Sequence, residues 1–108
     1  MNHFELVCIL KPDLSKQSQD QVEENMKKYI NESGGKIVDQ EIWGLKNLAY
    51  PIKKSNKGYY IFIQFDIDAK ELLNINKSLN LNENIIRHLS VKVENHEKLP
   101  TMMAQQKN

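Results

Sequence analysis

The chain has 108 residues, of which 40% are hydrophobic and 27% are charged, a composition that fits one soluble globular domain. Its formal net charge is only +1, so overall charge does not indicate a nucleic-acid-binding protein, and such a role has to rest on where the charges lie. No apolar run approaches the roughly 20 residues needed to cross a membrane, and the first residues lack the features of a secretory signal. We therefore expect a cytosolic protein.

A strand and a helix are predicted first. Residues 4–10 form a nearly continuous apolar run, which is typical of a strand in the middle of a sheet. The run contains Cys8, the single cysteine, which we expect to be a buried packing residue. Ser15 is the predicted N-cap of an amphipathic helix, which Gly34 and Gly35 end. The apolar residues of this helix recur at helical spacing, and they are Val22, Met26, Tyr29 and Ile30.

A long hairpin follows, from Lys36 to Phe65, with a lysine-rich loop between its two strands. In the second strand, alternate residues form two sets: Tyr59, Ile61, Ile63 and Phe65 on one face, and Tyr60, Phe62 and Gln64 on the other. In the first strand, Gly44 indicates a bulge, and Pro51 indicates a position at the edge of the sheet. Gly58 is expected to supply a positive backbone dihedral in the loop.

The last predicted elements are a helix and a strand. Asp68 and Glu71 have the spacing of a capping box at the start of the helix. The strand spans residues 85–93, with Ile85, Leu89, Val91 and Val93 on one parity. The polar segment 96–108 lacks periodicity, so we predict a domain over residues 1–95 and a flexible C-terminal tail over residues 96–108.

The order βαββαβ predicts an α+β fold of the ferredoxin-like, split βαβ type, with a four-stranded antiparallel sheet and two helices on one face. The other face would be open. Tyr60 and Phe62 would then project from the centre of that open face, half exposed, where a protein partner could cover them. If both faces of this strand prove to be buried within one chain, the edge strand with Trp43 and Leu48 is the alternative partner surface.

The hairpin segment GLKNLAYPIKKSNKGYY resembles the hairpin signature of the bacterial small-subunit ribosomal protein S six family. Phe4-Glu5, Pro12 and the segment from Asn82 to Arg87 extend the resemblance over nearly the whole domain. Asn47, where relatives often continue a basic run, and Phe4, where tyrosine is commoner, depart from the pattern. The resemblance implies a ferredoxin-like architectural protein of the cytoplasmic ribosome. It also implies that this protein binds small-subunit ribosomal RNA together with ribosomal protein S eighteen.

Six basic residues are candidates for RNA contacts, and they are Lys46, Lys53, Lys54, Lys57, Arg87 and His88. Lysines at the end of a hairpin can follow phosphates, although charged runs are often simply solvated loops. Arg87 could equally be a surface salt-bridge residue. Tyr60 and Phe62 could stack on bases, but we prefer a protein partner for them because the strand signatures of RNA-recognition modules are missing.

Other classes of function find less support in the residues. An enzyme of the acylphosphatase type would need an arginine in the loop after the first strand, and that loop is Lys11-Pro12-Asp13, so we expect no enzyme. A small-molecule sensor or a homo-oligomeric regulatory domain remains open. We predict that Trp43 is a packing residue. Cys8 and the three histidines, His3, His88 and His96, have no ligand-like spacing, so neither a metal site nor a cofactor is expected.

Overall fold

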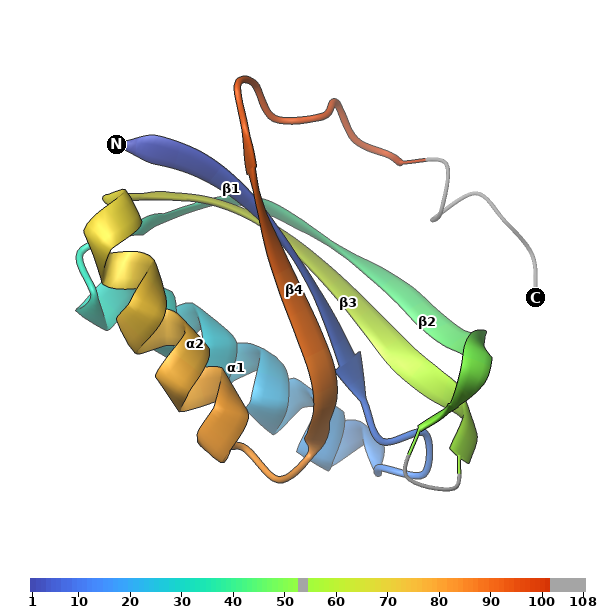
Figure 1. Cartoon of the computed structure of the whole chain (residues 1–108). Helices are drawn as coiled ribbons and strands as arrows, with labels where there is room; N and C mark the ends of the chain where they lie inside the picture. Colours follow the sequence, from blue (N-terminus) through green and yellow to red (C-terminus); the bar gives the residue numbers. More distant parts are fainter. Residues whose placement is uncertain (53–54, 102–108) are drawn as a thin grey trace.

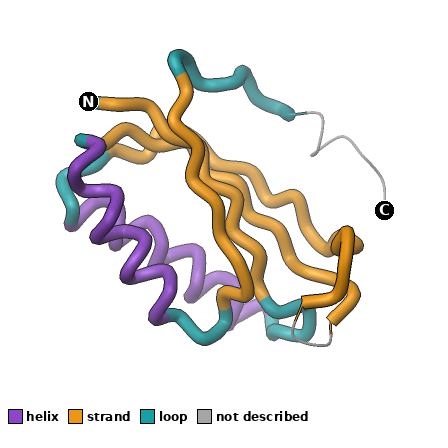
Figure 2. Tube along the Cα trace, in the orientation of Figure 1, coloured by secondary structure: helices purple, strands orange, loops and turns teal. Residues whose placement is uncertain are grey.

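The computed structural model describes residues 1–52 and 55–101 (Figure 1). The elements in chain order are β1 (Asn2–Leu10), α1 (Lys16–Glu32), β2 (Lys36–Ile52), β3 (Ser55–Ile67), a 3-10 turn (Ala69–Glu71), α2 (Leu72–Leu81) and β4 (Ile85–Val93). The strands form one antiparallel sheet in the order β2-β3-β1-β4. Helices α1 and α2 lie on the same face of this sheet, as Figure 2 shows. The predicted ferredoxin-like fold is confirmed, with β2 at an edge.

The hydrophobic core lies between the helices and the two central strands. Its members come from alternate positions of β1 and β3 and from one side of each helix, and they include Leu6, Cys8, Leu10, Val22, Met26, Ile30, Ile61, Ile63, Phe65, Ile75 and Leu79. Cys8 is buried as predicted, and this burial raises the pKa of its thiol to about 12. A thiol in this state packs like a small apolar side chain. Within the described residues, neither helix is long and apolar enough to span a membrane.

The two ends of α1 are built as predicted. The hydroxyl of Ser15 accepts a hydrogen bond from the backbone N–H of Ser18 at 3.1 Å, which caps the first turn. At the other end, Gly34 has a φ of 85°, the left-handed conformation that favours glycine. The Gly35 N–H then donates to the Ile30 carbonyl at 2.9 Å. The chain therefore leaves the helix sharply enough to enter β2.

The start of α2 differs from the prediction. A 3-10 turn precedes the helix, and neither Asp68 nor Glu71 makes a side-chain capping hydrogen bond. The amide oxygen of Asn2 instead accepts from the Ala69 N–H at 3.1 Å. The expected capping box was wrong because the cap comes from β1, far away in the sequence.

Each outer strand contains an irregularity that determines which residues face the helices. In β2 the pairing shifts between Ile42 and Gly44, and Gly44 has a φ of 80°, so the predicted bulge is confirmed. In β4 the shift places Ile85 opposite the core residue Leu10 but leaves the following residues on the other parity. The prediction of a single parity for β4 is therefore wrong. Leu89 and Val91 face away from the helices and are 61% and 49% exposed.

Gly58 lies inside β3 and does not have a positive φ, which corrects the predicted loop role. Position 58 has no room for a side chain, because a Cβ atom there would overlap the Cγ2 methyl group of Ile9 on β1. The first and third strands can pack at this end of the sheet only if position 58 has no side chain.

We predict that Gly58→Ala lowers the free energy of unfolding by about 1 to 3 kcal/mol, the usual cost of overpacking, measured by urea denaturation. In an Ile9→Ala background the same substitution should cost clearly less, since the clashing methyl group is gone. An equal cost in both backgrounds would mean that the contact with Ile9 is not the reason for the glycine.

Candidate functional site

The sheet face opposite the helices carries the residues expected to bind a protein partner. Tyr60 and Phe62 project from β3 on this face, opposite Ile9 and Val7 of β1, as their parity predicted. Tyr60 is half-buried, but Phe62 is only 4% exposed. The expectation that both rings are half exposed is therefore wrong for Phe62, whose face of the strand is covered within the chain.

Trp43 supplies part of this cover. Because Ile42 pairs with Ile61 and Gly44 pairs with Tyr60, Trp43 is the extra residue of the β2 bulge. Its ring stacks on Phe62 with a centroid separation of 4.9 Å and an interplanar angle of 13°, and it lies 6.4 Å from Tyr60. The indole N–H donates to Glu41 at 3.0 Å. Trp43 is thus a packing residue, as predicted, and its ring covers Phe62 on the face opposite the helices.

The segment of residues 94–101, here called the tail segment, crosses the same face from β4 towards β2 (Figures 1 and 2). The Glu97 N–H donates to Glu5 at 2.9 Å, and the Gln64 amide donates to the Glu97 carbonyl at 2.6 Å. Thr101, which is 3% exposed, donates to Glu41 from its N–H at 3.0 Å and from its hydroxyl at 2.7 Å. Residues 96–101 therefore lie against the sheet, whereas the sequence placed them in a flexible tail. Residues 102–108 lie outside the described part of the chain.

An apolar area stays exposed beside the tail segment. Leu89 and Val91 of β4 lie opposite Val7 and Glu5 of β1 on this face. A pocket of about 220 Å³ lies there, and it is lined by Val7, Ile9, Arg87, His88 and Leu89. The sequence predicted one parity for Ile85, Leu89 and Val91 and did not indicate that Leu89 and Val91 are on the surface, because nothing local marks the shift in register.

The fold places the candidate RNA-binding residues in different environments. Lys57 and Arg87 are exposed at the end of the sheet where the β2–β3 hairpin turns and β4 begins (Figure 1). Lys46 lies at the same end but is only 6% exposed. Lys53 and Lys54 lie outside the described residues. The two exposed charges thus lie at the same end of the sheet, Arg87 on the face opposite the helices and Lys57 on the parity of Tyr59, which faces them.

His88 lies apart from Arg87, although the two are adjacent in the chain. It pairs with the core residue Cys8, so its ring is on the side of the sheet that faces the helices. Its Nε2 atom is 2.7 Å from the Asn80 amide oxygen, and burial lowers the pKa of its imidazole. A histidine with a lowered pKa is mostly neutral at pH 7, so it adds little charge to a phosphate-binding surface.

A cluster that the sequence did not indicate joins β1, β3 and the tail segment. The Asp66 Oδ1 atom is 2.6 Å from His3 Nδ1 and 2.7 Å from His96 Nε2. Burial acts to raise the pKa of Asp66, but the hydrogen bonds from the two histidines outweigh it, so the pKa is lowered. These three residues are far apart in the sequence, so their spacing along the chain does not indicate a cluster.

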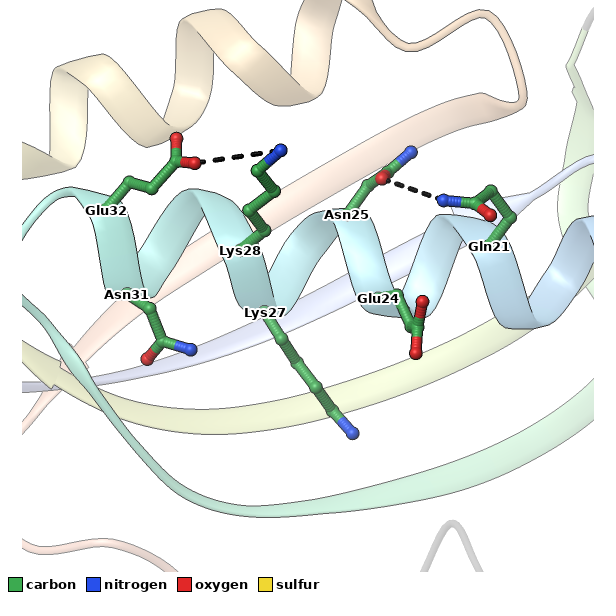
Figure 3. A pocket seen from close by; sticks show the side chains of 7 residues that line it. All are labelled: Gln21, Glu24, Asn25, Lys27, Lys28, Asn31 and Glu32. Atoms are coloured by element: carbon green, nitrogen blue, oxygen red, sulfur yellow. Dashed lines mark hydrogen bonds and ion pairs between the residues drawn. The ribbon is translucent and has the colours of Figure 1, made fainter.

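A larger hollow of about 530 Å³ lies along the exposed side of α1 (Figure 3). Its lining consists of Gln21, Glu24, Asn25, Lys27, Lys28, Asn31 and Glu32. Gln21 bonds Asn25 at 3.1 Å, and Lys28 pairs with Glu32 at 3.8 Å, both between successive turns of the helix. All seven side chains come from one helix and do not converge on a point, so we assign this hollow to the solvated helix surface.

Comparisons with known proteins point to one family. The family model described as ribosomal protein S6 matches residues 3–92. Small ribosomal subunit protein bS6 of Zymomonas mobilis is 38% identical over 100 residues, which cover 93% of this chain and 81% of that protein. The bS6 protein of a Ruegeria species is 33% identical, covering 97% and 90%. The crystal structure of 30S ribosomal protein S6 from Thermotoga maritima has a TM-score of 0.81 at 30% identity, covering 85% of this chain and 87% of that one.

The burial of Phe62 predicts that this residue stabilises the isolated domain. We expect Phe62→Ala to lower the free energy of unfolding by about 3 to 5 kcal/mol and Ile61→Ala by about 2 to 5 kcal/mol, both measured by chemical denaturation. Leu89→Ala, on the same face but exposed, is the control and should change it by less than about 0.5 kcal/mol. If Phe62→Ala costs no more than Leu89→Ala, the face under Trp43 is not part of the stable core.

The contacts of Glu41 predict that the end of the tail segment is released by acid. Burial acts to raise the pKa of Glu41, but the hydrogen bonds from Trp43 and Thr101 lower it more, so the folded pKa lies below the ordinary value of 4.5. The stabilisation is therefore complete above pH 4.5 and is lost as the pH falls through the folded pKa.

This release can be measured by following the Thr101 amide signal by NMR during an acid titration. The Thr101 signal should move with the protonation of Glu41, while that of Ser18, bound to a hydroxyl group, should stay constant. A Thr101 signal that is insensitive to the titration of Glu41 would contradict the prediction.

Proposed function

The chain belongs to the ribosomal protein S6 family, and from this we propose that it binds small-subunit ribosomal RNA together with ribosomal protein S eighteen. Its place is thus the small ribosomal subunit in the cytoplasm, and its role there is structural. The observation that carries the proposal is the match to the family model over residues 3–92, nearly the whole folded part of the chain. We expect no catalytic activity.

The exposed cations at the hairpin end of the sheet suit the RNA-binding side. Lys57 and Arg87 are exposed there, and Lys53 and Lys54 belong to the connection between β2 and β3. A guanidinium group binds phosphate through two parallel hydrogen bonds, and lysines add charge without base specificity. Lys46, which is buried, and His88, whose pKa is lowered, are less suited to phosphate contacts.

The opposite end of the sheet is acidic, which favours the basic end as the RNA-binding side. Glu5, Asp66 and Glu97 lie at this acidic end, where Glu5 accepts from the Glu97 N–H and Asp66 contacts His96 of the tail segment. Phosphates would be repelled from this acidic end and attracted to the basic one. With a net charge of +1, the protein on its own should bind RNA weakly. Tight binding would then require a second protein.

In this proposal the protein partner covers the apolar area next to the tail segment. Leu89 and Val91 are 61% and 49% exposed, and Tyr60 and Val7 continue the area across β1 and β3. Phe62 contributes indirectly, because it packs under the ring of Trp43 and stabilises β3. The edge strand is the competing surface, because Ile42 and Leu45 on β2 are 44% and 39% exposed. The open face is preferred because its apolar residues are contiguous and border a pocket.

The test compares binding of a small-subunit ribosomal RNA fragment with and without ribosomal protein S eighteen. We expect tight binding only with the partner, and a slope of log affinity against log salt on the order of −3 for three or four phosphate contacts. Arg87→Ala should weaken binding and reduce the slope by about 1, whereas His88→Ala, its neighbour on the other face, should not.

Three outcomes would contradict the proposal. They are full affinity without the partner, a flat salt response, and an equal loss in the two variants. A loss of partner binding in Leu45→Ala but not in Leu89→Ala would move the partner to the edge strand.

A further inference from the structure

We propose that His3, Asp66 and His96 form a binding site for a zinc ion that fastens the tail segment to the sheet. The three residues come from β1, from β3 and from the tail segment. This inference goes beyond the ribosomal role and does not depend on it, because the site lies at the acidic end of the sheet face, away from Lys57 and Arg87.

The three side chains direct suitable atoms to one point. His3 Nδ1, His96 Nε2 and a carboxylate oxygen of Asp66 all lie within 4.8 Å of one another. Imidazole nitrogen and carboxylate oxygen are ordinary zinc ligands, with bonds of about 2.0 to 2.2 Å. Ligand atoms at the corners of such a tetrahedron are roughly 3.4 Å apart. The two nitrogens, now 2.6 and 2.7 Å from the Asp66 oxygen, would have to move away by less than about 1 Å.

The surroundings allow this movement. The His3 side chain is 41% exposed, so its ring can turn, while Asp66 and His96 are held more firmly at 20% and 13%. The exposed side next to His3 also leaves room for water as a fourth ligand, as in zinc sites with three protein ligands. His3 and His96 already lie with their ring centroids 5.0 Å apart and their planes at 64°, so the rings do not stack and block the space between them.

A second carboxylate orients His96. The Glu5 Oε2 atom is 3.4 Å from His96 Nδ1, and it also accepts hydrogen bonds at 2.9 Å from the Glu97 N–H and the Gln64 amide. Glu5 is thereby fixed next to Nδ1. When zinc displaces the proton through which Nε2 bonds Asp66, the proton on Nδ1 is held by Glu5, and the Nε2 lone pair is directed at Asp66 and His3. Metal-binding histidines are commonly held by a carboxylate in this way.

A zinc ion at this site would have a structural consequence. His96 is near the start of the tail segment, and Thr101 at its other end is held by Glu41. With His96 bound through the metal to β1 and β3, both ends of the segment would be attached to the sheet face next to Leu89 and Val91. Zinc would therefore control how firmly the tail segment covers the area beside the proposed partner surface.

The experiment titrates ZnCl2 into the untagged full-length protein, freed of metal by a chelator, and follows the heat of binding. We expect one ion per chain. His96→Ala and Asp66→Asn should weaken binding at least about tenfold, and Glu5→Gln, which keeps every ligand, should weaken it by about 10- to 100-fold. His88→Ala, the control, removes the one histidine outside the cluster and should bind zinc like the unmodified protein.

Ring signals of the histidines provide a second measurement that is independent of the stability of the variants. In the unmodified protein, zinc should shift the NMR signals of His3 and His96 but not those of His88. Absence of binding would overturn the proposal. So would loss of binding in His88→Ala equal to that in His96→Ala, since this would show unspecific binding to surface histidines.

Discussion

Burial of β3 on both of its faces is the constraint on which the rest of the structure depends. Ile61 and Ile63 are fully buried under the helices, and Phe62 between them is 4% exposed on the opposite face. A four-stranded sheet with helices on one side has no second layer to cover that opposite face. The chain provides one from its own parts, namely the ring of Trp43 and the tail segment. Trp43 is on this face because it follows Ile42, which pairs with the helix-facing Ile61.

Charge on this sheet face is separated along the strands, which the net charge of +1 conceals. At one end Glu5 and Asp66 accept hydrogen bonds from the tail segment and from histidines. At the other end Arg87 is exposed on this face, and Lys57 is exposed on the parity of Tyr59, which faces the helices. The carboxylates thus attach a piece of the chain itself to the sheet. In the proposed function, the basic end would be the part of this nearly neutral protein that faces RNA.

Local signals in the sequence were enough for the fold and for several details of it. The apolar run of β1, the cap at Ser15 and the glycines at positions 34 and 44 each depend on nearby residues, and each was predicted. What could not be predicted depends on partners far away in the sequence. The contacts of His96 with Asp66 and of Thr101 with Glu41 have no local signature, so the tail segment was taken for a flexible end. For the residues of the candidate site, the parity of Tyr60 and Phe62 could be predicted from β3, but the burial of Lys46 and Phe62 could not.

The irregular pairing of β4 also affects how this protein is compared with its relatives. Ile86 is the extra residue between Ile85, opposite Leu10, and Arg87, opposite Ile9. A homologue that lacks this residue would keep the same helices and strands. In its β4, however, each side chain would lie on the opposite face of the sheet. Position-by-position alignment through this strand is therefore meaningful only when the gap is placed at Ile86. The same holds for grafting β4 between homologues, where one residue of length decides whether Leu89 meets solvent or the helices.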